Sequence, residues 1–117
     1  MPDVTTVVQD YIATWNEADP ERRRALVART FAEDASYVDP LMAGAGPQEI
    51  DAMIAAAQAA YPGHRFELAD GPDAHHDRVR FSWHLVGGEG RVATGLDVAT
   101  LGEDGRLRDV TGFLEAA

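Results

Sequence analysis

The spacing of apolar residues changes once along this chain, at Gly63, and the change fixes the order of its secondary structure. Before Gly63 the spacing is helical, with apolar side chains on one face of each helix. Asp19-Pro20 and Gly46-Pro47 predict two helix starts, because proline fits the first helical turn. The inward faces are predicted to carry Val4, Val7, Val8, Tyr11 and Trp15, then Leu26, Val27 and Phe31, then Ile50, Met53, Ile54, Ala57 and Tyr61.

After Gly63 apolar and polar residues alternate, which predicts strands. These begin at Phe66, at Val79, near Arg91 and at Leu107, and a short earlier strand over 35–39 ends before Pro40. The expected turns are Gly71-Pro72-Asp73, Gly87 to Gly90 and Glu103-Asp104-Gly105, and the expected loop is Ala43 to Gly46. Helices followed by an antiparallel meander indicate one α+β domain over residues 1–117, with helices on one face of the sheet.

Charge and composition exclude several functions. Twenty acidic residues against ten basic ones give a net charge of −10, which disfavours nucleic acid as a partner. The cluster Arg22-Arg23-Arg24 is interpreted as a solvated helix face. No cysteine is present, so disulfides and thiolate chemistry are excluded. Neither a signal peptide nor a membrane-spanning stretch is recognisable, so we expect a cytoplasmic protein without a membrane partner.

The histidines and glycines give no sign of a metal or cofactor. His75 and His76 are sequence neighbours that should point to opposite faces of a strand, and no histidine pair has the spacing of metal ligands. No glycine-rich loop lies between a strand and a helix as phosphate binding requires. We therefore expect neither a metal site nor a nucleotide cofactor.

Asp97 is the most informative single residue, because it interrupts the apolar strand Gly95 to Ala99. Its neighbours on the same face, Ala93, Gly95 and Ala99, are small and leave room for a cavity. An ionised carboxylate in an apolar cavity is costly, so such a group tends to hold its proton. The alternative is that the strand is reversed and Asp97 faces water.

Two further residues have both a structural and a functional interpretation. Asp39 ends the first strand before a proline and is either a turn-capping aspartate or a carboxylate at the mouth of a pocket. Tyr11 lies on the inward face of the first helix and is either core or a hydroxyl facing a carboxyl group in the same cavity.

These features resemble the nuclear transport factor 2-like superfamily, which contains SnoaL-like polyketide cyclases and ketosteroid isomerase. The resemblance covers nearly the whole chain. It rests on the segments Val7 to Asn16, Phe31 to Ala35, Val38-Asp39-Pro40, Gly95 to Val98 and Gly105-Arg106-Leu107. It implies a cone-shaped, curved antiparallel sheet wrapped around the three helices and enclosing an apolar pocket. Because this fold hosts enzymes, carriers and dimerisation modules, it does not fix the function.

The resemblance to ketosteroid isomerase implies roles for three residues. Asp39 would move a proton beside a carbonyl, while Tyr11 and a protonated Asp97 would donate hydrogen bonds to the enolate oxygen, as known for that enzyme. Trp83 is bulkier than the isomerase pattern, and Gly112 removes volume from the last strand, so a steroid is not implied. The predicted ligand-binding residues are Trp15, Tyr37, Met53, Phe66, Phe81 and Trp83.

The leading hypothesis is an enzyme that uses aspartate acid–base chemistry on a small apolar carbonyl compound, by isomerisation or aldol-type cyclisation. One alternative is a non-catalytic ligand-binding or dimerisation domain. An epoxide hydrolase is disfavoured, because no arginine stands beside Asp97. The apolar residues on the other face of the strand, Val92, Leu96 and Val98 among them, predict a homodimer formed through the outer face of the sheet.

Overall fold

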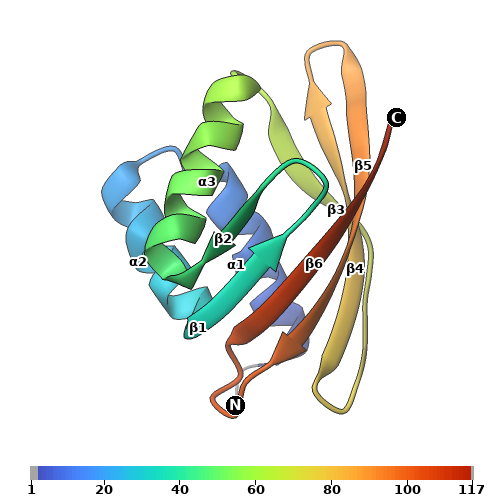
Figure 1. Cartoon of the computed structure of the whole chain (residues 1–117). Helices are drawn as coiled ribbons and strands as arrows, with labels where there is room; N and C mark the ends of the chain where they lie inside the picture. Colours follow the sequence, from blue (N-terminus) through green and yellow to red (C-terminus); the bar gives the residue numbers. More distant parts are fainter. Residues whose placement is uncertain (1–2, 117) are drawn as a thin grey trace.

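The structure is a computed structural model that describes residues 3–116. Three helices lie on one side of a curved six-stranded sheet (Figure 1). The α+β architecture is therefore confirmed. In chain order the elements are α1 (Val4–Asn16), α2 (Pro20–Thr30), β1 (Phe31–Val38), β2 (Ala43–Ala45), α3 (Gly46–Ala60), β3 (Arg65–His75), β4 (Arg78–Gly87), β5 (Gly90–Leu101) and β6 (Leu107–Ala116).

The helix starts agree with the sequence prediction. The Asp19 side chain accepts a hydrogen bond of 2.8 Å from the backbone N–H of Arg22, and Pro20 opens α2. Gly46, at φ 81°, and Pro47 open α3 directly after β2. At α2 the Asp19 oxygen replaces a missing intrahelical acceptor, whereas α3 has no side-chain cap and only the proline fits its first turn.

The sheet has the order β2-β1-β6-β5-β4-β3 and is mixed. The meander from β3 to β6 is antiparallel, as predicted, but β1 and β6 are parallel. The prediction of an antiparallel sheet throughout is wrong at this pair. The meander returns β6 beside β1 running in the same direction, and no local pattern in either strand encodes that pairing.

The expected turn at Gly71-Pro72-Asp73 is also wrong, because these residues lie inside β3. The register of β3 on β4 shifts between Leu68 and Asp70 and again before Asp73. Since β3 is an edge strand, its irregular part accommodates a proline without the loss of an interior hydrogen bond. The chain reverses later, between His75 and Arg78.

The expected loop after Pro40 contains the short strand β2, which pairs with β1 from Ser36↔Ala45 to Val38↔Ala43. The connection of this hairpin carries Leu41 and Met42. No helix among residues 3–116 is long and apolar enough to cross a membrane.

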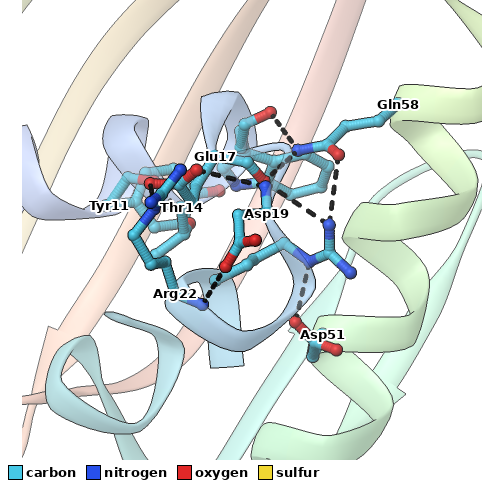
Figure 2. A network of polar contacts seen from close by, with 9 residues as sticks. Tyr11, Thr14, Glu17, Asp19, Arg22, Asp51 and Gln58 are labelled. Carbon is cyan, nitrogen blue, oxygen red and sulfur yellow. Dashed lines mark hydrogen bonds and ion pairs between the residues drawn. The ribbon is translucent and has the colours of Figure 1, made fainter. Parts of the chain in front are cut away.

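Arg23 corrects the interpretation of the basic cluster as a solvated face. Its side chain is buried and lies 2.8 Å from Asp51 of α3, and it also donates a hydrogen bond of 3.2 Å to Gln58. Figure 2 shows Gln58 directed at the end of α1, where it donates to the carbonyl oxygens of Trp15 and Glu17. A buried arginine thus links the three helices.

Candidate active site

Asp97 lies inside the fold at the centre of β5. Its partners in the sheet register are Phe81 of β4 and Gly112 of β6, and its side chain is 1% exposed. Along β5 the buried residues are Gly95, Asp97 and Ala99, while the intervening Leu96 and Val98 are exposed. The prediction that Asp97 turns inward, between small neighbours, is confirmed.

Asp97 accepts two buried hydrogen bonds through the same oxygen. The Tyr11 hydroxyl donates to Oδ2 at 2.7 Å and the Trp83 indole N–H donates to it at 3.1 Å. Oδ1 is buried without a partner. Burial raises the pKa of Asp97 to about 6, against the opposing effect of the two donors and with a further contribution from the charge of Asp39.

Burial also raises the pKa of the Tyr11 phenol well above its ordinary range, and the charge of Asp97 adds to the rise. Tyr11 therefore stays protonated and acts as a donor at any physiological pH. Its ring packs against Phe81 and Phe31, with centroids 5.2 and 5.8 Å away. This packing holds the hydroxyl toward β5.

Trp83 reaches Asp97 because its neighbour across the sheet is a glycine. Trp83 pairs with Gly95, and a Cβ on Gly95 would stand only 2.1 Å from the Trp83 ring. The indole thus occupies the space of a missing side chain, which is how aromatic residues often cover glycines in sheets. The sequence analysis assigned Trp83 to the pocket wall and missed its hydrogen bond to Asp97.

Asp39 combines its two alternative roles. Its Oδ1 accepts hydrogen bonds from the backbone N–H groups of Leu41 and Met42, at 2.8 and 3.0 Å, and so caps the turn between β1 and β2. Its Oδ2 accepts a hydrogen bond of 2.6 Å from the Tyr37 hydroxyl. The turn orients the carboxylate, and the tyrosine connects it to the interior.

Gly112 lets the Asp97 carboxyl group, the Asp39 side chain and the Tyr37 hydroxyl approach one position. A Cβ at this position would lie 2.8 Å from Asp97 Oδ1, 3.1 Å from Asp39 Cβ and 3.4 Å from the Tyr37 hydroxyl. A side chain at position 112 would therefore crowd all three groups. Burial raises the pKa of Tyr37 above its ordinary value, and the charges of Asp97 and Asp39 contribute. The two acids and two tyrosines therefore form one electrostatic group.

An apolar cavity of about 70 Å³ lies beside this group, between α1, α3 and the inner face of the sheet. It is much smaller than the several hundred Å³ of an ordinary ligand pocket, so it suits a small molecule. Of the predicted site residues, Tyr11, Trp15, Tyr37, Asp39, Phe66 and Trp83 line it. The lining is completed by Ala57, Tyr61 and Ala93, which the sequence analysis placed on inward faces, and by residues that it did not single out: Ile12, Leu41, Met42, Leu85 and Leu114.

Three predicted site residues do not line the cavity. Asp97 lies behind Tyr11 and Trp83, which cover it. Phe81, expected in the wall, packs behind the Tyr11 ring instead. Met53 is on the side of α3 near Met42 and Ala43, where a separate surface depression lies. All three have the inward spacing of the lining residues, but none of them reaches the cavity.

Within the described residues, no three His, Cys, Asp or Glu side chains gather closely enough to bind a metal ion. His75 and His76 do not point to opposite faces as expected. Their Nδ1 atoms lie 3.1 Å apart, because the chain turns at His76, whose φ is 52°. Two exposed imidazoles at a hairpin tip do not constitute a metal site.

Comparison with known proteins identifies the family to which the chain belongs. A model of the SnoaL-like domain matches residues 8–110. The match spans most of the sequence, and the protein is a member of the SnoaL-like family. The resemblance to nuclear transport factor 2-like proteins is thereby confirmed. No curated protein matched the chain.

Several solved structures share the fold. A protein from Agrobacterium tumefaciens strain C58, provisionally described as an isomerase of the SnoaL-like family, is 51% identical over 96% of this chain and 97% of that chain, with a TM-score of 0.91. A Sinorhizobium meliloti protein, provisionally described as a polyketide cyclase, is 19% identical over 96% and 94% of the chains, with a TM-score of 0.72. An NTF2-like protein of unknown function from Mesorhizobium loti is 18% identical over 99% and 98%, with a TM-score of 0.73. The last two likenesses concern the fold alone.

Proposed function

We propose that this protein is an enzyme that moves a proton on a small apolar carbonyl compound, by isomerisation or by aldol-type cyclisation. The observation that supports this most is the meeting of Asp39 and Asp97 around Gly112, beside an apolar cavity. Two acids in different environments can serve as base and as hydrogen-bonding acid in one site. The isomerase description of the Agrobacterium relative agrees with this proposal.

In the proposed reaction Asp39 is the base. It lines the cavity, and its carboxylate would take a proton from the carbon beside the substrate carbonyl. The C–H electron pair then moves into an enolate, whose oxygen carries the negative charge. Return of the proton from Asp39 to another carbon completes an isomerisation. In an aldol cyclisation the enolate carbon instead attacks a second carbonyl carbon, whose C=O π bond opens to an alkoxide, and the alkoxide takes the proton back from Asp39.

Tyr11 would hold the enolate oxygen, and Asp97 would act through Tyr11. Asp97 does not line the cavity, so it is a positioning residue in this proposal. While ionised, Asp97 keeps the Tyr11 proton directed at itself. When protonated, it can donate to the Tyr11 oxygen instead, and the Tyr11 O–H is then available to the substrate.

The test is hydrogen–deuterium exchange beside the carbonyl of cyclohex-2-enone, followed by NMR in D₂O. We expect the protein to accelerate exchange, and Asp39→Asn to reduce the acceleration by about 10²- to 10⁴-fold. Asp73→Asn is the matched control, because Asp73 pairs with Arg80 on the solvated edge of the sheet, away from the cavity. Unchanged exchange in Asp39→Asn would rule out Asp39 as the base.

One observation favours a second candidate, a non-catalytic ligand-binding domain. The Asp39 carboxylate already accepts hydrogen bonds from two backbone N–H groups and from Tyr37, which is also what a purely structural turn cap would do. This alternative predicts that the wild-type protein binds cyclohex-2-enone saturably without accelerating exchange.

A further inference from the structure

The inner face of the sheet has few side-chain atoms around Asp97. Asp97 pairs with Gly112 of β6 in the register, and its inward neighbours along β5 are Gly95 and Ala99. Two of these three positions have no side chain, and the third has only a methyl group. Such a patch of nearly bare backbone would be a floor for a deeper cavity if nothing covered it.

The indole of Trp83 covers this patch. A Cβ on Gly95 would stand 2.1 Å from Cζ2 and 2.7 Å from Cη2 of the ring, so the ring lies directly on the glycine. The same ring holds Asp97 through its N–H, at 3.1 Å, and is 7% exposed. Because Trp83 lines the cavity whereas Gly95 and Asp97 do not, the indole separates the cavity from the bare part of the sheet.

Phe66, the neighbouring aromatic residue of the lining, has a different support. Its ring contacts the Trp83 ring edge-on, with centroids 5.1 Å apart, but its partner in the register is Leu85. The Leu85 side chain also lines the cavity. A smaller residue in place of Phe66 would therefore uncover another side chain, whereas a smaller residue in place of Trp83 would join the cavity to the space over Gly95.

We propose that Trp83 sets the depth of the cavity and thereby restricts the site to small carbonyl compounds such as monocyclic ketones. The indole fills the space that the second ring of a larger substrate would need. The cavity volume of about 70 Å³ agrees with this assignment. The inference deepens the proposed function, on which it rests for the carbonyl class of substrate, and adds a limit on substrate size.

The test compares the binding of cyclohex-2-enone with that of the bicyclic octalone in which a second carbon ring is fused to the enone ring. Dissociation constants are measured by ¹H–¹⁵N NMR titration of the wild type, Trp83→Leu and Phe66→Leu. We expect the wild type to prefer the monocyclic ketone. In Trp83→Leu the ratio of the two constants should shift by about tenfold toward the octalone, because its added methylenes are buried in the freed space. In Phe66→Leu the shift should stay below about threefold.

A second substitution distinguishes a deeper cavity from a generally loosened one. Gly95→Ala in the Trp83→Leu background places a methyl group in the freed space, so it should reverse most of the shift toward the octalone. General loosening would persist in this double variant. Urea denaturation checks that each variant is folded, and Trp83→Phe, which keeps a ring, should shift the preference in the same direction by a smaller factor.

Several results would overturn the inference. These are equal binding of both ketones by the wild type, failure of both to bind, an unchanged preference in the folded Trp83 variants, an equal shift in Phe66→Leu, and a shift that Gly95→Ala does not reverse. Binding requires no turnover, so the test is separate from the proposed reaction. If the wild type accelerates no exchange but its size preference depends on Trp83, the proposed catalysis fails and the inference stands.

Discussion

The indole of Trp83 occupies the space that a side chain at Gly95 would fill, and this contact sets the direction of its N–H toward Asp97. Gly95→Ala should displace the ring and break that hydrogen bond, because the new Cβ would stand 2.1 Å from a ring atom. We expect the free energy of unfolding to fall by about 1–3 kcal/mol in urea denaturation.

Gly88→Ala is the control for this substitution. Gly88 lies in the turn between β4 and β5, and nothing stands within 4 Å of the position that an added Cβ would take. Its free energy of unfolding should change by no more than about 0.5 kcal/mol. Equal stability of Gly95→Ala and Gly88→Ala would contradict the role given to Gly95.

Asp97 should make the free energy of unfolding decrease as the pH rises, which is opposite to the effect of an aspartate whose pKa is lowered by folding. Its pKa is raised from 3.8 to about 6, so the folded protein holds this proton more tightly than the unfolded chain. The resulting stabilisation is present at low pH and is lost as the pH rises from about 4 to about 6. Between about pH 3 and about pH 7, which covers the whole titration, the free energy of unfolding of the wild type should fall by about 3 kcal/mol relative to Asp97→Asn.

Urea denaturation of both proteins at several pH values checks this prediction. The difference between the two curves isolates Asp97, because every other titrating group is shared. Parallel pH profiles, or a wild type that gains stability over Asp97→Asn as the pH rises, would show that Asp97 ionises like a solvated aspartate.

The buried Arg23 and its exposed neighbour Arg22 should differ sharply in their contribution to stability. Arg23→Met leaves Asp51 without its partner in a poorly solvated position and should cost about 3 kcal/mol in the free energy of unfolding. Arg22→Met removes only an exposed ion pair with Glu17, at 3.5 Å, and should cost less than about 1 kcal/mol. The free energies of unfolding of the two variants are measured by chemical denaturation. Both variants replace an arginine with methionine, so equal decreases in the free energy of unfolding would show that Arg23 is solvated like Arg22.

We propose that a second copy of the chain covers the outer face of the sheet. Leu96 of β5 and Phe113 of β6 are paired in the register and exposed, and Phe113 is 55% exposed. Val92 and Val98 extend this apolar area. In sedimentation experiments at micromolar concentration the wild type should have the mass of a dimer, and Phe113→Glu should shift it to a monomer. A monomeric wild type would contradict the proposal.

The elements with a strong local pattern could be predicted from the sequence. The helical spacing through Tyr11 and Trp15 and the alternation through Asp97 gave the correct inward faces, because one buried face dominates each element. The turn chemistry of Gly71-Pro72 was misleading, since an edge strand tolerates these residues. The parallel pairing of β1 with β6 depends on contacts between distant segments, so no local window contains it.

For the site too, the sequence predicted individual residues with a local pattern but not the contacts between distant segments. The sequence indicated Asp97, Asp39 and Tyr11, and it placed Tyr37 and Trp83 inside without their hydrogen bonds. A signal was available for Trp83, because a bulky ring opposite Gly95 fits a paired register. Nothing in the sequence predicted that Arg23 is buried between its two exposed arginine neighbours, since its partner Asp51 comes from another helix.

The irregular stretch of β3 has a consequence beyond the shape of this sheet. An edge strand offers free backbone groups on which another chain can add, and repeated addition builds a fibril. Pro72 lacks an N–H to offer, and the register shifts around Asp70 interrupt the regular ladder that an incoming strand would follow. This border of the sheet is therefore a poor template for polymerisation.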